Sequence, residues 1–189
     1  TEVSASWGLR TATGPFKWAV GFEDFDLDGD LDLFLANGHI YQPAGQRNQV
    51  FWNVDGRFVE HPTTDDEALA AVQSSRAALF GDLDGDHALD VVVSSVGARP
   101  QVLRNRAGCG HWIEVRVTPP VVGTRVRVTS NGYTLERQVS LSGSYLGSSA
   151  TTLHFGLGLT TRASVEVRWP DGRVLRRDPA PIDQVLFAR

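Results

Sequence analysis

Two short stretches of the chain carry acidic side chains at alternate positions around a glycine. The first runs from Asp24 to Asp32 and the second from Asp82 to Asp90. Like charges packed this closely repel one another unless a cation neutralises them. Oxygen donors at this density suit a hard cation with about six to eight oxygen ligands, which favours Ca²⁺ over Mg²⁺. We therefore predict two Ca²⁺ sites, whose charge would also cancel the formal net charge of −4.

Counted from the first aspartate of each loop, places one, three, five and nine are carboxylates that we expect to converge on one ion. The backbone carbonyl at place seven, from Asp30 or Ala88, is expected to add a ligand. Gly29 allows a sharp turn at place six of the first loop, whereas the second loop has Gly85 at place four and His87 at place six. This difference leaves open whether the second loop binds Ca²⁺ as well as the first. The predicted ligand residues are Asp24, Asp26, Asp28, Asp30 and Asp32 in the first loop and Asp82, Asp84, Asp86, Ala88 and Asp90 in the second.

The EF-hand shares this acidic pattern, but it needs flanking helices and a bidentate glutamate at place twelve. Here place twelve is Leu35 in the first loop and Val93 in the second, and both lie in apolar runs that predict strands. The pattern therefore favours a clip between two strands. A plain acidic turn is the competing interpretation, since Asp and Gly are common in turns, but two aligned copies argue against it.

The two loops belong to a longer internal repeat. Residues 17–24 align with residues 75–82 at an offset of 58, which also superposes the apolar runs after the loops. Residues 49–53 align with residues 101–105 at an offset of 52, because the first repeat has a longer loop around residues 38–47. Each repeat predicts about four strands, a pattern typical of β-propeller blades. One short helical turn is expected within residues 64–73.

The composition changes after Cys109, where the acidic loops end. Short runs of alternating apolar and polar residues follow, with the hairpin-turn pairs Asn131-Gly132 and Asp171-Gly172 among them. These features predict a β-sandwich of about seven strands. We therefore predict an all-β protein in which residues 1–109 form two blades (1–57 and 58–109) and residues 110–189 form the sandwich.

Residues 22–33 and 80–91, which hold the acidic loops, resemble FG-GAP (VCBS-type) repeats, the Ca²⁺-binding blades of integrin-like β-propellers. Residues 111–117, 123–128, 143–146, 153–158 and 165–172 resemble an ASPIC/UnbV domain. The pair in this order is similar to the cartilage-acidic-protein-1-like family. The resemblance implies a secreted, periplasmic or cell-surface module with structural Ca²⁺, used for adhesion or recognition of a protein or glycan partner. It also implies an alternative, a substrate-holding or catalytic component of bacterial enediyne-type biosynthesis.

Propellers of this kind usually have about seven blades, and two blades cannot close a ring without leaving strand edges exposed. We therefore expect the sequence to be the C-terminal part of a longer protein, or another chain to supply further blades.

The sequence favours a binding module over an enzyme. None of the five histidines pairs with Cys109 or with a serine at a known catalytic spacing. His39 and Tyr41, in the long loop of the first repeat, are the candidate partner-binding residues. The dispersed basic residues argue against a nucleic-acid partner, and no apolar run is long enough to span a membrane.

Overall fold

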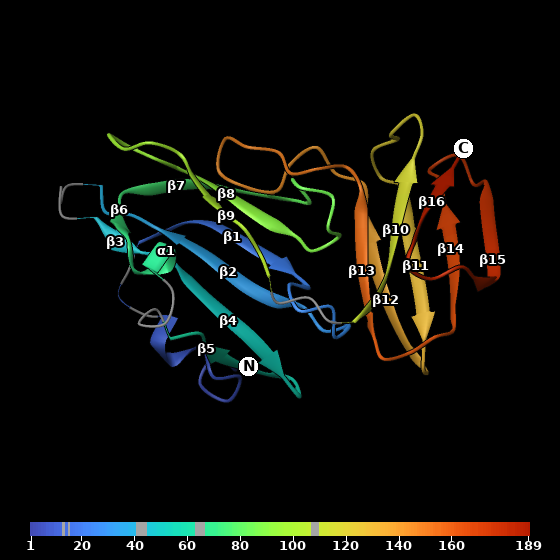
Figure 1. Ribbon diagram of the computed structural model, residues 1–189, viewed down its shortest axis with the longest axis horizontal. Coiled ribbons are helices and arrows are strands. Elements are labelled where there is room, and N and C mark those ends of the chain that lie inside the picture. Colours follow the sequence, from blue (N-terminus) through green and yellow to red (C-terminus); the bar gives the residue numbers. More distant parts are fainter. Residues whose placement is uncertain (13, 15, 41–44, 63–66, 107–109) are drawn as a thin grey trace.

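The computed structural model describes residues 1–189 except 13, 15, 41–44, 63–66 and 107–109. The chain is all-β and consists of two strand-rich halves that lie side by side (Figure 1). Strands from residues 17–103 make up one half, and strands from residues 111–188 make up the other. No helix in the described ranges is long and apolar enough to cross a membrane.

The first half contains one antiparallel sheet from each repeat. The sheet of the first repeat joins β1 (Lys17–Glu23), β2 (Asp32–Asn37), β4 (Gln49–Val54) and β5 (Arg57–Glu60), in that order. The sheet of the second repeat joins β7 (Ser75–Gly81), β8 (Asp90–Ser95) and β9 (Gln101–Leu103). The connections contain the 3-10 turn η1 (Leu9–Ala12), the short helix α1 (Glu67–Ala70) and a small pair of strands, β3 (Gln46–Arg47) with β6 (Val72–Gln73).

The two repeats share one strand register, as the alignment of their sequences predicts. Glu23 pairs with Asp32 across β1 and β2, and Gly81 pairs with Asp90 across β7 and β8. Both strand pairs also show a register shift after their first residue. The second repeat departs from the expected four-stranded blade, because its sheet contains three strands within the described residues. After Leu103 the chain continues to the second half of the molecule instead of adding an outer strand (Figure 1).

The two blade sheets pack against each other over one hydrophobic core. Phe34 from β2 meets Phe80 from β7, with ring centroids 6.0 Å apart, and Val93 from β8 is fully buried beside them. A Cβ on Gly21 would come within 2.2 Å of the Phe80 ring, so β1 has glycine at this point of close approach. Burying each large side chain contributes about 1.5–3 kcal/mol. This core therefore fixes the relative position of the two acidic loops, which leave the ends of β1 and β7.

The second half is a β-sandwich of seven strands, as predicted. The strands are β10 (His111–Val117), β11 (Arg125–Ser130), β12 (Tyr133–Gln138), β13 (Leu153–Gly158), β14 (Ala163–Arg168), β15 (Val174–Ala180) and β16 (Gln184–Ala188). One sheet has the order β13-β10-β16 and the other the order β12-β11-β14-β15. Ile113, Val126, Phe155 and Val167 are completely buried between the sheets. On β11 the buried residues alternate with exposed ones, so this strand has one buried and one wet face, whereas residues on both faces of β13 are buried.

Two local predictions are also met. Asn131 and Gly132 have positive φ values of 49° and 83°, which a tight type I′ hairpin turn requires. The expected helical turn is α1, which buries Leu69 against the core between the blade sheets. Residues 64–66 of the predicted segment lie outside the described residues.

Candidate metal-binding loops

The aspartate at place nine ties each loop to the neighbouring strand. Asp32 accepts a hydrogen bond from the backbone N–H of Phe25 at 2.9 Å with one oxygen and from that of Asn53 at 2.8 Å with the other. Asp90 accepts equivalent bonds in the second repeat, at 3.0 and 2.8 Å. Both aspartates are buried. Place nine therefore has a structural role in holding the clip closed, in addition to its predicted role as a ligand.

Both loops have the left-handed backbone conformation at places four and six. In the first loop Leu27 has φ 65° and Gly29 has φ 99°, and in the second Gly85 has φ 81° and His87 has φ 68°. Each loop thus holds one glycine and one larger residue in the conformation that glycine tolerates best. The histidine at place six does not change the course of the second loop.

The carboxylates of each loop also organise the loop backbone. At place one, Asp24 accepts the N–H of Gly29 at 3.1 Å and Asp82 accepts the N–H of His87 at 3.2 Å. The aspartates at places three and five each accept the N–H two residues later, at 2.8 to 3.3 Å. A carboxylate can accept about four hydrogen bonds, so these bonds leave further oxygen lone pairs available to a cation.

The first loop contains a buried carboxylate with one unpaired oxygen. Asp24 is completely buried, and its Oδ1 has no hydrogen-bond partner among the described residues. Burial, followed by the charges of Asp28 and Asp32, raises the pKa of Asp24 to about 7. Burial also raises the pKa of Asp32 to about 6. Oxygens of Asp24, Asp26 and Asp32 lie within 4.8 Å of one another, so this donor set fits a divalent cation.

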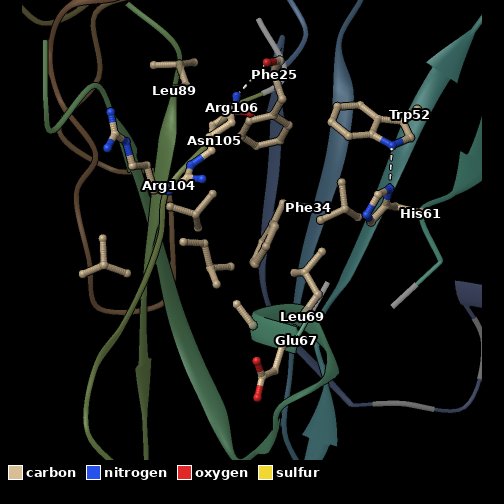
Figure 2. A pocket seen from close by; sticks show the side chains of 15 residues that line it. Phe25, Phe34, Trp52, His61, Glu67, Leu69, Leu89, Arg104, Asn105 and Arg106 are labelled. Carbon is tan, nitrogen blue, oxygen red and sulfur yellow. Dashed lines mark hydrogen bonds between the residues drawn. The ribbon is translucent and has the colours of Figure 1, made fainter. Parts of the chain in front are cut away.

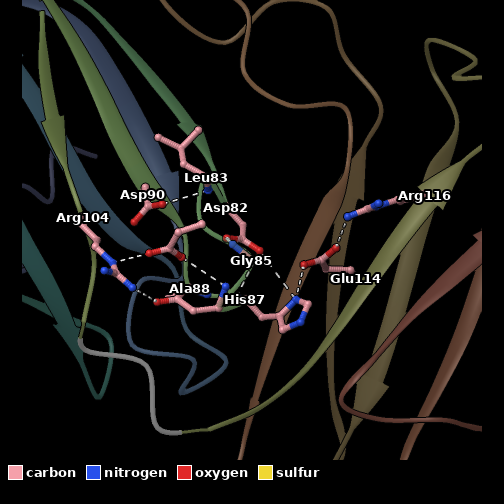
Figure 3. Close-up of polar contacts among 11 residues, drawn as sticks. Asp82, Leu83, Gly85, His87, Ala88, Asp90, Arg104, Glu114 and Arg116 are labelled. Carbon is pink, nitrogen blue, oxygen red and sulfur yellow. Dashed lines mark hydrogen bonds and ion pairs between the residues drawn. The ribbon is translucent and has the colours of Figure 1, made fainter.

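In the second loop an arginine side chain from the same repeat already pairs with the acidic residues. Oxygens of Asp82, Asp84 and Asp86 lie within 4.8 Å of one another, but the guanidinium of Arg104 contacts two of these residues (Figure 3). Its Nε meets Asp84, and a terminal nitrogen lies 3.7 Å from Asp86. The first repeat has Trp52 at the equivalent position, one residue before the end of the matching segment 49–53. A cation entering the second loop must therefore compete with Arg104.

The remaining predicted site residues lie outside the two oxygen clusters described above. Asp28 and Asp30 lie in the first loop outside its tightest oxygen cluster, and burial raises the pKa of both. Ala88 is buried at place seven, and its role as a carbonyl ligand stays a prediction. The ring of His39 packs edge-on against Phe16 at 4.5 Å. Tyr41 lies outside the described residues, so the predicted partner-binding pair is untested.

Sequence reasoning missed a cavity of about 790 Å³ between the two blade sheets (Figure 2). Its walls include the apolar residues Phe25, Phe34, Leu69 and Leu89, which come from both sheets, α1 and the acidic loops. At one side the indole N–H of Trp52 donates to His61 Nδ1 at 3.1 Å, and at the other lie Arg104 and Arg106. Trp52 and Arg104 occupy equivalent positions of the two repeats at the offset of 52, but this alignment does not predict the cavity.

The sandwich contacts both acidic loops, which the sequence did not predict. The N–H of Gly158 donates to the carbonyl of Leu27 in the first loop at 2.8 Å. His87 in the second loop lies 3.0 Å from Oε1 of Glu114 on β10. Between these contacts, Arg137 on β12 forms an ion pair with Glu23 at the end of β1. The two loops are therefore part of the junction between the halves of the molecule.

Comparison with known proteins agrees with this division of the chain. Residues 24–93 match the model of the FG-GAP-like repeat, and residues 114–188 match the model named ASPIC and UnbV. The chain thus contains a segment similar to FG-GAP-like repeats, followed by a segment similar to ASPIC/UnbV domains. The repeat segment contains both acidic loops, and the ASPIC/UnbV domain is the sandwich that rests on them. The domain boundaries at residues 57, 58, 109 and 110 stay predictions.

Three curated relatives share both parts. Cartilage acidic protein 1 of Mus musculus and that of Homo sapiens are each 29% identical over 175 residues, which covers 83% of this chain. The protein of the same name from Xenopus tropicalis is 28% identical over 173 residues. The chain spans about a quarter of the length of these relatives, 25 to 26%.

Proposed function

We propose that this chain is a Ca²⁺-stabilised extracellular binding module that takes part in adhesion or recognition. The observation that carries the proposal is the buried carboxylate of Asp24, whose Oδ1 has no partner among the described residues and whose neighbours are also acidic. A buried anion of this kind is costly unless a cation neutralises it. A bound Ca²⁺ would supply that charge and would hold the β1–β2 clip in one conformation.

The donor set supports Ca²⁺ more than a transition metal in the first loop. All candidate ligands there are oxygens, and they come from flexible carboxylates and backbone carbonyls, which Ca²⁺ accepts at variable geometry. We propose a Ca²⁺ ion in each loop, with Asp24, Asp26, Asp28, Asp30 and Asp32 as the ligands of the first. In the second loop the ion would have to displace Arg104 from Asp84 and Asp86, so we propose weaker binding there.

The proposed role of the ions is structural, and recognition belongs to other surfaces. The loop carboxylates hydrogen-bond to the loop backbone, and Leu27 of the first loop bonds to the sandwich, which supports a structural role for the ions. We propose the loop around His39 and Tyr41 as a contact for a protein or glycan partner. The name of the relatives refers to cartilage, which supports a secreted or cell-surface location for this chain as well. In a bacterial cell the corresponding location would be periplasmic or on the surface.

The cavity between the blade sheets favours a second candidate function. Its volume of about 790 Å³ and its largely apolar wall are typical of sites for small organic ligands. A substrate-holding component of natural-product biosynthesis would use such a space. Binding of a polyene-like ligand with micromolar affinity, lost in Phe34→Trp, would favour this second function over adhesion.

Thermal unfolding with and without chelator tests the Ca²⁺ proposal. A ligand present at 100 times its Kd stabilises the folded state by about 2.7 kcal/mol, which corresponds to roughly 5–10 °C for a chain of this size. We expect the melting temperature to fall by that amount in excess EDTA and to recover with Ca²⁺. Asp24→Asn should lose most of the shift, whereas Asp171→Asn, in an exposed hairpin of the sandwich, should keep it. An unchanged melting temperature in EDTA would refute the proposal.

A further inference from the structure

The junction between the second loop and the sandwich brings together side chains of a second ligand type. His87, Asp82 and Glu114 offer donor atoms that all lie within 4.8 Å of one another (Figure 3). His87 Nδ1 is 3.0 Å from Glu114 Oε1 and 3.8 Å from Asp82 Oδ2. The first loop has glycine where the second has His87, so the imidazole distinguishes the second loop from the first.

These side chains are held in place from several directions. The ring of His87 stacks on Trp112 with centroids 3.8 Å apart and an interplanar angle of 18°. Glu114 is 2% exposed, and its second oxygen accepts a hydrogen bond of 3.2 Å from Arg116. Asp82 is oriented by the backbone N–H of Gly85 at 2.7 Å. Partners that orient ligands in this way are characteristic of metal sites.

The spacing and chemistry of the donors fit a small transition-metal ion. Zn²⁺ binds nitrogen and carboxylate oxygen at about 2.0–2.2 Å, so donors around a tetrahedral ion lie roughly 3.3–3.6 Å apart. The distances of 3.0 and 3.8 Å lie on either side of this range. An imidazole nitrogen is a preferred ligand of Zn²⁺ and a poor one for Ca²⁺. Two carboxylates would also neutralise the charge of a divalent ion.

A second observation comes from a residue beside this cluster, outside the group of donor atoms that lie within 4.8 Å of one another. His154 on β13 faces Glu114 across the β10–β13 pair. It is 3% exposed, and neither ring nitrogen makes a hydrogen bond of good geometry among the residues that the structure describes, although the backbone of His87 lies near the ring. A buried imidazole whose nitrogens lack well-formed hydrogen bonds is costly unless it binds a ligand.

We propose that Asp82, His87 and Glu114 form a site for Zn²⁺ or a related divalent transition-metal ion, with the neighbouring imidazole of His154 as the fourth donor. The ion would join the second FG-GAP-like repeat to the ASPIC/UnbV domain. This site is separate from the first acidic loop, and it does not depend on the Ca²⁺ proposal for that loop.

The test uses the whole chain, stripped of metal and then given only enough Ca²⁺ to fill the first acidic loop before Co²⁺ is added, because Asp82 belongs to both groups of donors in the second loop. We expect the visible absorption bands of four-coordinate Co²⁺, and their loss when Zn²⁺ displaces it. His87→Gly removes the imidazole but keeps a residue suited to the φ of 68°, so this variant should fold. It should weaken Zn²⁺ binding at least 100-fold, since loss of a mere supporting partner costs about 10–100-fold.

His111→Ala is the matched control, because His111 also pairs with a carboxylate, Asp183 at 2.8 Å, outside this junction. Its Zn²⁺ affinity should equal that of the parent chain. His154→Ala should weaken binding about tenfold or more, and an unchanged affinity in that variant would remove His154 from the ligand set. Absence of Co²⁺ bands in the parent chain, or bands that persist in His87→Gly, would overturn the proposal. The Ca²⁺-dependent melting shift is read separately, so either proposal can fail alone.

Discussion

The backbone N–H of Gly158 donates a hydrogen bond of 2.8 Å to the carbonyl oxygen of Leu27. Leu27 is the residue of the first acidic loop with φ 65°, and Gly158 ends β13 of the ASPIC/UnbV domain. Two residues earlier on β13, a Cβ on Gly156 would lie 2.1 Å from Oδ2 of Asp24. The sandwich therefore contacts both the backbone and the buried carboxylate of this loop, and the state of the loop must affect how the two halves pack.

The close approach at Gly156 predicts a destabilising effect of a single methyl group. Gly156→Ala should lower the free energy of unfolding by about 1–3 kcal/mol, because the methyl must displace Asp24 or the backbone of Leu27. Gly81→Ala is the control, since a Cβ there would be 3.4 Å from Ala150, an ordinary contact. Urea denaturation of both variants checks the difference. Equal unfolding free energies of the two variants would mean that Gly156 does not lie in close contact with the first acidic loop in solution.

The raised pKa of Asp24 predicts the pH dependence of the metal-free protein. The folded state holds this proton up to a pH of about 7, whereas the unfolded chain releases it near about 3.9. The contribution to folding is therefore complete below about pH 4 and is lost as the pH rises toward 7. In EDTA, the melting temperature should fall over this range.

The same proton should oppose binding of Ca²⁺, because a ligand carboxylate must be ionised. Affinity for Ca²⁺ should therefore rise between about pH 5 and pH 7.5, as measured by calorimetric titration. In Asp24→Asn the slope of the melting temperature in EDTA should flatten. A parent chain that becomes more stable with rising pH in EDTA would contradict the assignment.

The ion pairs of Arg104 predict that the two acidic loops differ in their affinity for Ca²⁺. Arg104→Gln frees Asp84 and Asp86 from their internal cation and should raise the Ca²⁺ affinity of the second loop a few-fold. The effect is modest because Arg104 is 55% exposed, and exposed ion pairs contribute at most about 1 kcal/mol. Calorimetric titration of the parent, Arg104→Gln and the exposed Arg99→Gln as control would resolve the two classes of site. Identical titrations of parent and Arg104→Gln would show that Arg104 does not compete with the ion.

The Arg137–Glu23 pair predicts an energetic link between the halves. Both side chains are less than one-fifth exposed, at 16% and 18%, so removing one leaves a poorly solvated charge. A double-mutant cycle with Arg137→Met and Glu23→Gln should give a coupling energy of at least about 1 kcal/mol. The exposed pair of Arg173 with Asp171 should give a smaller value in the same experiment. Coupling energies of equal size would place the Arg137 pair among ordinary surface contacts.

Regular spacing made much of this structure predictable. The repeat offset of 58 reappears as strand register, and the alternation of apolar residues reappears as the buried faces of the sandwich. The missing fourth strand of the second repeat was not predictable, because the chain after Leu103 leads into another domain and only the docking of that domain decides its path. His87 at place six left open whether the second loop binds Ca²⁺ as well as the first. Its backbone has a positive φ, as that of Gly29 does.

The sequence by itself determined the features that depend on near neighbours: the acidic clips, the turns, the strand periodicity and the order of the two domains. Only the tertiary structure decided which distant groups meet, such as Arg104 with Asp84, Glu114 with His87 and Gly158 with Leu27. Local patterns follow from backbone geometry and hydrophobic period, which a short window of sequence contains. Contacts between the halves depend on how two finished sheets fit together, and that fit is a property of their whole surfaces.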